Sequence, residues 1–237
     1  KKIKTVFIKK NYKNQKDEIN LLKKRGKIIS TNSREEALSI AEKRKFQVAL
    51  LDDGLQQKNI IYDLKIACFN SDEGLGNGYL LPAGPLRESM DELKGYHIAF
   101  LNGEKKNNKL YKKLKSINKN LKIFEGKYVP RNLKNFNRNK EYLMFCAIGN
   151  PQEFKNTLLK FNFKIKHTVI FPDHYKISSY KIKNLKVMAK KQGLTIITTE
   201  KDYLRLDKAE TKNIKFLKVN LKIKKMNKFK KILLSNL

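Results

Sequence analysis

The segment that most constrains the fold is Val48-Ala49-Leu50-Leu51-Asp52-Asp53-Gly54. Its four apolar residues form a short buried strand of the kind found in parallel sheets. Two carboxylates follow where that strand must end, and Gly54 allows a sharp turn. Ligands of open α/β sheets bind beyond the carboxyl ends of the strands, and Asp at such an end often holds magnesium in nucleotide-phosphate enzymes. Capping of a turn or helix start by Asp52 and Asp53 explains the pattern equally well, so the rest of the chain has to decide.

The first half of the chain alternates short apolar runs with helix signals. Ser33-Arg34-Glu35-Glu36 is a capping box that predicts a helix through Arg44. Another helix is predicted from Asp17 to Lys24. This alternation predicts a parallel sheet with right-handed crossovers. The predicted strands are Thr5–Ile8, 27–29, 46–51, 63–69, 98–102 and 121–128.

The second half restarts the pattern after a polar segment at residues 129–140, which we interpret as a linker between domains 1–128 and 141–237. Helices are predicted from Pro151 to about Phe161, from Ser178 or Ser179 to Gln192, and from Glu200. Residues 222–237 read as a basic amphipathic helix that packs on the core or touches a membrane surface. The predicted strands are 142–148, 163–171, 194–199 and 214–219.

Composition excludes few functions. The formal net charge of +32 attracts anions such as nucleic acid, anionic lipid or phosphorylated substrates. The Lys residues are spread over every segment, whereas a nucleic-acid-binding protein usually gathers its basic residues on one face, often with aromatic side chains. Cys68 and Cys146 each lie in an apolar run, which predicts buried free thiols in a reducing compartment. No run of about 18 apolar residues is present to cross a bilayer.

Two further places gather residues capable of chemistry. The long Gly- and Pro-rich loop from Asn70 to Glu88 ends in Arg87-Glu88, and loops of this length inside a compact domain are usually functional. It is either a rigid connector with a surface ion pair or a wall that binds phosphate and metal. A strand of the second half ends in Asp173-His174. For His174 alone, a structural role would be the better interpretation.

Taken together, these segments resemble the tetraacyldisaccharide 4'-kinase family of lipid A synthesis. Order and spacing fit from about residue 5 to the C-terminus, and Asp17-Glu18 stands where that family carries Gly-Asp-Glu. The matching segments are Asp52-Asp53-Gly54-Leu55-Gln56, Asn77-Gly78, Leu81-Pro82-Ala83-Gly84-Pro85-Leu86-Arg87-Glu88, Gly149-Asn150-Pro151 with Phe154, Phe171-Pro172-Asp173-His174 and Thr198-Thr199-Glu200-Lys201-Asp202.

The resemblance implies a fold and an activity. The fold would be α/β, a P-loop-NTPase-like parallel sheet with helices on both faces, plus a smaller C-terminal α/β domain. The family uses ATP and Mg²⁺ to phosphorylate the 4'-hydroxyl of a tetraacylated glucosamine disaccharide 1-phosphate, a lipid A precursor. It works as a peripheral protein at the cytoplasmic face of the bacterial inner membrane, and no nucleic acid takes part.

The resemblance also implies roles for single residues. Asp17, paired with His174, would help to deprotonate the sugar hydroxyl, and a histidine is suited to share that proton near neutral pH. Arg87 would offset charge on the transferred group. Phosphoryl transfer depends mainly on positioning and charge neutralisation. Asp52, Asp53 and Glu88 would organise magnesium and the phosphates, with Gln56 also in the cofactor site. His97 and His167 keep a structural interpretation.

The chain departs from the family pattern at its beginning. Nothing in it matches Gly-x-x-x-x-Gly-Lys-[Ser/Thr], Lys16 replaces the Gly before Asp17, and Ile8–Tyr12 replaces an Arg-Gly-Tyr segment. The first residue is Lys. We therefore expect that the sequence is truncated at its N-terminus and that residues 1–237 alone are nearly inactive as a kinase. The reason is that the glycine-rich loop with this motif holds the β- and γ-phosphates of ATP. The alternatives are a basic nucleic-acid-binding protein and a related kinase for another sugar.

Overall fold

The computed structural model describes residues 3–11 and 16–236, and for Lys16 and Asp17 it describes the backbone alone. The chain forms two compact units. Unit 1 consists of Lys1–Asp52 with Pro130–Val219, and unit 2 consists of Asp53–Val129 with Asn220–Leu237. Each unit thus combines segments that are far apart in sequence. The division into domains 1–128 and 141–237, with a linker at residues 129–140, stays a prediction.

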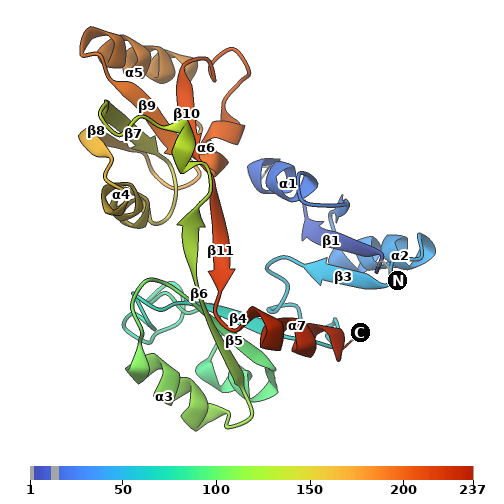
Figure 1. Cartoon of the computed structure of the whole chain (residues 1–237). Coiled ribbons are helices and arrows are strands. Elements are labelled where there is room, and N and C mark those ends of the chain that lie inside the picture. Colours follow the sequence, from blue (N-terminus) through green and yellow to red (C-terminus); the bar gives the residue numbers. More distant parts are fainter. Residues whose placement is uncertain (1–2, 12–15, 237) are drawn as a thin grey trace. The chain divides into compact units, whose positions relative to one another are not determined.

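Unit 1 contains a three-stranded parallel sheet with the strand order β2-β1-β3 (Figure 1). Alternating apolar residues bury one face against α2, whose N-terminus is capped by the Ser33 hydroxyl as the capping box predicts. The core of this part is Val6, Ile8, Ile29, Ala37 and Ala41. The elements are β1 (Thr5–Lys10), α1 (Lys16–Lys23), β2 (Ile28–Thr31), α2 (Arg34–Lys43) and β3 (Val48–Leu51).

Unit 1 also contains a four-stranded parallel sheet with the order β10-β9-β7-β8. Its central strand β7 is apolar on both faces, and one apolar cluster covers each face. Such two-sided burial is typical of parallel sheets. The elements are η2 (Leu133–Asn135), β7 (Glu141–Cys146), α4 (Pro151–Lys160), β8 (Lys164–Ile170), α5 (Ser179–Lys191), β9 (Thr195–Thr199), α6 (Glu200–Arg205) and β10 (Ile214–Leu217).

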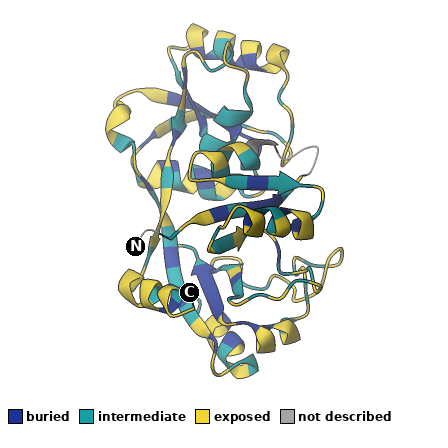
Figure 2. Ribbon diagram, turned by 90° about the vertical axis from the view of Figure 1, so that its right-hand side faces the viewer, coloured by how far each residue is buried: buried dark blue, intermediate teal, exposed yellow. Residues whose placement is uncertain are grey.

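Unit 2 is built on a sheet with the order β11-β6-β5-β4, in which β4, β5 and β6 are parallel. The buried residues, dark blue in Figure 2, include four consecutive positions of β5. The elements are β4 (Ile66–Asn70), η1 (Met90–Gly95), β5 (Ile98–Asn102), α3 (Asn108–Ile117), β6 (Lys122–Pro130), β11 (Val219–Ile223) and α7 (Met226–Leu234).

The structure corrects two details of the sequence interpretation. The predicted helix over residues 222–237 begins only at Met226, because Val219–Ile223 form strand β11 beside β6. The packing of this helix on the core is confirmed, since Ile232 is buried beside Phe100 and Phe124. Cys146 is buried as predicted, whereas the prediction was wrong for Cys68, which is exposed on β4. Among the described residues, no helix is long and apolar enough to cross a membrane.

A glycine substitution tests the packing of unit 2. A Cβ atom at Gly126 in β6 would lie 2.6 Å from the Phe100 ring and 3.0 Å from the Lys222 carbonyl oxygen. We expect Gly126→Ala to lower the free energy of unfolding by about 1–3 kcal/mol, because the backbone of β11 cannot easily move away. Urea denaturation followed by circular dichroism measures this. Gly95→Ala is the control, since a Cβ there meets nothing within 4 Å; equal effects of the two substitutions would contradict the packing.

Candidate active site

The first part of the candidate site lies where β1 and β3 end side by side in unit 1. Ile8 pairs with Leu51 in the parallel register, so the next residues, Lys9 and Asp52, lie at neighbouring strand ends. Lys9 is only 2% exposed, and its ammonium group binds the Asp52 carboxylate and, at 2.7 Å, Glu18 Oε2 of α1. Asp52 is therefore not a free carboxylate but one side of a three-residue ion cluster.

The electrostatics of this cluster favour the charged forms of Lys9 and Glu18. Burial alone would lower the pKa of Lys9, but hydrogen bonds and charges from Asp52 and Glu18 outweigh burial and raise it. Burial alone would raise the pKa of Glu18, but hydrogen bonds from Lys9 and Lys201 outweigh burial and lower it. Sequence reasoning missed Lys9, because a lysine on a strand is normally exposed.

A second lysine continues the ion pairs to the other sheet of unit 1. Lys201 at the start of α6 donates to Glu18 Oε1 at 3.1 Å, and its Nζ atom lies 3.5 Å from His174 Nε2. The side chains Asp52, Lys9, Glu18, Lys201 and His174 thus form one continuous polar chain, which we call the Asp52–His174 chain. Two residues singled out from the sequence, one from each half, are brought into the same network.

His174 lies in the loop after β8 with a left-handed φ of 58°. Its Nδ1 atom accepts a hydrogen bond from Arg205 Nη2 at 3.1 Å, and Asp173 Oδ2 lies 3.8 Å from Nε2. The ring is therefore oriented by two cations, Lys201 and Arg205, and one carboxylate.

Asp202 fixes Arg205 and so the orientation of His174. The Asp202 carboxylate is 1% exposed and accepts from the Ala147 N–H at 3.1 Å, the Thr199 hydroxyl at 2.7 Å and Arg205 at 3.1 Å. Arg205 in turn donates to the Ala147 carbonyl at 2.8 Å. The predicted Thr-Thr-Glu-Lys-Asp run thus serves the site through Lys201 and Asp202. Burial and the charge of Asp202 raise the pKa of the neighbouring Cys146 thiol to about 12, so it stays protonated.

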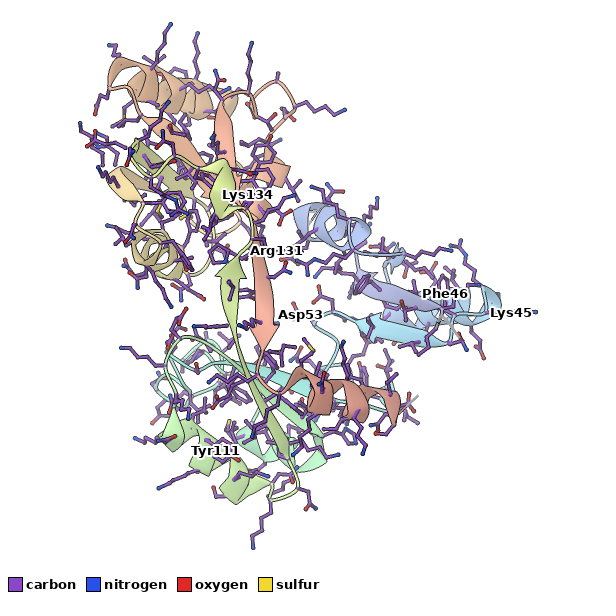
Figure 3. All side chains as sticks on the ribbon, in the orientation of Figure 1. Lys45, Phe46, Asp53, Tyr111, Arg131 and Lys134 are labelled. Atoms are coloured by element: carbon purple, nitrogen blue, oxygen red, sulfur yellow. The ribbon has the colours of Figure 1, made fainter. Side chains whose placement is uncertain are left out.

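The other predicted residues lie in unit 2. Asp53 occupies the turn after β3 (Figure 3), with φ of 53°, and its carboxylate pairs with Arg87 at 3.3 Å. Both side chains are more than half exposed, so this pair contributes little to stability. Glu88 accepts a hydrogen bond from the Tyr96 hydroxyl. Burial, with this bond, raises the pKa of Tyr96 and keeps it a donor. Gln56 is exposed in the same turn region as Asp53.

Asp17 belongs to α1, but its side chain lies outside the described part of the structure. Its predicted pairing with His174 stays a prediction.

The loop that carries Arg87 and Glu88 is held by its own hydrogen bonds. Leu81 N donates to Leu86 O at 2.8 Å, and Asn77 Nδ2 donates to Ala83 O at 2.8 Å. Gly76 is required at its position, since its φ is 59° and a Cβ would lie 2.6 Å from Pro85. The loop therefore presents Arg87 from a defined backbone, as both a rigid connector and a phosphate-binding wall would, and its role in binding phosphate stays a prediction.

The candidate ligands for Mg²⁺ include the carboxylates of Asp52 and Asp53. Within the described residues, no group of three His, Cys, Asp or Glu side chains is arranged to hold a metal ion. Asp52 and Asp53 are each paired with a cation, Lys9 and Arg87 respectively. Mg²⁺ that arrives with a nucleotide needs only one or two carboxylates, with phosphates and water as its other ligands. Asp52 and Asp53 are ligands of the type that such an ion takes, and their binding of Mg²⁺ stays a prediction.

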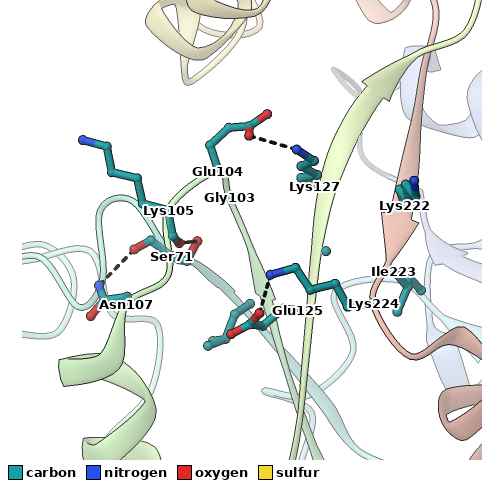
Figure 4. A pocket seen from close by; sticks show the side chains of 12 residues that line it. Ser71, Gly103, Glu104, Lys105, Asn107, Glu125, Lys127, Lys222, Ile223 and Lys224 are labelled. Carbon is teal, nitrogen blue, oxygen red and sulfur yellow. Dashed lines mark hydrogen bonds and ion pairs between the residues drawn. The ribbon is translucent and has the colours of Figure 1, made fainter.

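A separate cavity of about 320 Å³ lies in unit 2 beyond the ends of β4 and β5 (Figure 4). Its two carboxylates are already paired, Glu104 with Lys127 at 3.3 Å and Glu125 with Lys224 at 2.7 Å. The remaining lining cations are Lys105 and Lys222. The cavity therefore carries an excess of positive charge beside β11.

Comparisons with known proteins agree on one family. A family model described as Tetraacyldisaccharide-1-P 4'-kinase matches residues 2–237. A protein named tetraacyldisaccharide 4'-kinase from Pelagibacter ubique (strain HTCC1062) is 44% identical over 222 residues, which are 93% of this chain and 71% of that protein. A protein of the same name from Rickettsia akari (strain Hartford) is 34% identical, over 87% of this chain and 62% of its own length.

A solved structure is similar as well. It is the crystal structure of the "apo" form of LpxK from Aquifex aeolicus in complex with ATP, with a TM-score of 0.70 over 98% of this chain and 79% of that chain. At 21% identity this likeness concerns the fold. It confirms the predicted α/β fold class.

Removal of the buried ammonium tests the ion cluster. We expect Lys9→Met to lower the free energy of unfolding by about 1–3 kcal/mol, because the Asp52 carboxylate then loses its ammonium partner and Glu18 keeps only Lys201. Urea denaturation measures the change. Lys164→Met, at an exposed position that begins β8, is the matched control. If both variants unfold at the same urea concentration, Lys9 does not hold the cluster together.

The lowered pKa of Glu18 gives a pH dependence. A carboxyl whose pKa is lower in the folded state stabilises the fold above its unfolded value of 4.5, and this contribution is lost as the pH falls through the folded value. We expect Glu18→Gln to be less stable than the unsubstituted protein near neutral pH and to lose less stability on acidification. Unfolding from about pH 7 to about pH 3 measures this. Glu36→Gln, exposed on α2, should keep the original slope; parallel curves for Glu18→Gln and the unsubstituted protein would refute the assignment.

Proposed function

Because this chain belongs to the Tetraacyldisaccharide-1-P 4'-kinase family, we propose that it transfers the γ-phosphate of ATP to the 4'-hydroxyl of a tetraacylated glucosamine disaccharide 1-phosphate. In this proposal it works as a peripheral protein at the cytoplasmic face of the bacterial inner membrane, in the synthesis of lipid A. The observation that carries the proposal is the Asp52–His174 chain, in which carboxylates and a histidine are held in one network by two lysines.

His174 is the proposed base, with Asp17 as its partner. In the structure Arg205 occupies Nδ1 and Lys201 lies near Nε2. Both cations are attracted to phosphate oxygens, so a bound triphosphate would draw them away from the ring. A ring nitrogen then becomes free to accept the proton of the sugar hydroxyl. Catalytic hydrogen bonds often reach their working geometry only in the substrate complex.

The carboxylates and Arg87 serve the phosphates in this proposal. Asp52 and Asp53 would hold Mg²⁺ together with phosphate oxygens, and the metal would neutralise charge on the transferred group. Glu88 and Gln56 complete the cofactor site. Arg87, exposed on its hydrogen-bonded loop, would exchange Asp53 for phosphate oxygens, since a guanidinium binds phosphate well.

Substitution of His174 tests the proposed base. We expect His174→Ala to lower turnover of ATP with the acylated disaccharide by roughly two to four decades, which is the usual contribution of general base catalysis. The assay uses the protein as its gene encodes it. The matched control is His167→Ala, because His167 contacts Gln192 at 2.8 Å on the exposed side of β8.

A loss below tenfold for His174→Ala, or an equal loss for His167→Ala, would return His174 to a structural role. The pH profile gives a second readout, because removal of a base eliminates the acidic limb of kcat/KM. A purely structural histidine would leave that limb in place.

A further inference from the structure

The acidic residues of this chain end well before its C-terminus. All 22 Asp and Glu residues lie at or before Glu210, while the 27 residues that follow contain nine Lys. Residues 105–124 and 174–199 also lack acidic residues, with eight and six Lys, but the C-terminal stretch is longer than either and has more Lys. The last segment, which contains β11 and α7, therefore has no carboxylate side chain of its own to offset its lysines.

The structure fixes how this segment is presented in unit 2. Phe229 of α7 packs edge-on against Phe124, with ring centroids 5.0 Å apart, and lies 6.5 Å from Phe100. Ile232 is buried in the same cluster. The apolar face of α7 is therefore already used to hold the helix on the sheet. The lysines of the helix, Lys228, Lys230 and Lys231, are exposed, and so is Lys225 at its N-cap.

Residues around α7 extend this basic surface. Lys222 and Lys224 of β11 line the cavity of Figure 4, and Lys224 is paired with the carboxylate of Glu125 of β6. Met226 and Leu234, at the two ends of α7, are exposed, Leu234 by 62%. Basic side chains with a few exposed apolar residues suit shallow contact with lipid head groups.

We propose that residues 220–234, the β11–α7 surface, form a docking surface for the anionic face of a phospholipid bilayer. The inference rests on the proposed function in one respect, since a lipid substrate brings the enzyme to a membrane. In clusters of four to eight lysines, each lysine contributes about 1 kcal/mol to the free energy of binding to an anionic membrane. Exposed aromatic side chains, on which nucleic-acid bases would stack, are absent from the described residues of this surface, because Phe229 packs inward.

Vesicle binding by charge-matched variants tests the proposal. One variant, called the α7 variant, carries Lys→Gln at Lys228, Lys230 and Lys231 of α7 and at Lys225, its N-cap. The control carries Lys→Gln at Lys183, Lys186, Lys190 and Lys191 of α5 in unit 1, which removes the same total charge. Sedimentation is measured with vesicles of phosphatidylcholine mixed with phosphatidylglycerol and with phosphatidylcholine alone, at low and high salt, without ATP or glycolipid.

We expect the α7 variant to lose at least about tenfold in affinity for the anionic vesicles, and the α5 variant to lose much less. Binding should weaken with salt, because exposed charges are screened. Equal losses for the two variants would overturn the proposal in favour of diffuse charge, as would equal binding to pure phosphatidylcholine. Thermal unfolding by circular dichroism verifies that both variants are folded. Since no turnover is measured, failure here is distinguishable from failure of the kinase proposal.

Discussion

The burial of one ammonium group determines how the parts of unit 1 are joined. Lys9 is almost fully removed from water, and an unpaired charge there would cost several kcal/mol. Two carboxylates, from α1 and from the end of β3, satisfy it. Glu18 is shared with Lys201, which belongs to a different sheet and lies 183 residues further along the chain. The charge requirement of Lys9 therefore places three elements that apolar packing alone would leave free to shift.

Much of this arrangement follows from local sequence patterns. The apolar run before Asp52, the capping box at Ser33 and the Pro151 helix start predict the strands and helices that the structure contains. The consecutive aspartates were expected to act together. In the structure they have different partners, because β3 ends at Leu51 and the backbone turns at Asp53, whose φ is 53°: Asp52 pairs with Lys9, and Asp53 pairs with Arg87.

Other features depend on contacts that no local pattern encodes. Lys9 carries no local sign of burial, since lysine is almost never buried without a partner and both its partners are distant in sequence. Lys201 and Arg205 could have been noticed, because residues four apart lie on one face of a helix. Strand β11 is not predicted from the sequence, because Lys222 and Lys224 are assigned to the basic helix that follows. Its apolar residues Val219, Leu221 and Ile223 nevertheless alternate with the period of two that is typical of a strand.

The two kinds of lysine in this chain separate structural charge from surface charge. Lys9 and Lys201 both form ion pairs with Glu18, so their charges are largely neutralised within the fold and contribute little to the electric field outside the protein. The lysines of α7 have no acid on their own segment, and the helix is fixed by aromatic contacts instead. A net charge of +32 spread over the whole chain says little about binding partners, because a Lys-rich composition produces such a charge whatever the protein binds. The local balance of charge is more informative, because the stretch after Glu210 has nine Lys and no acidic side chain, and Glu125 of β6 pairs with one of them, Lys224.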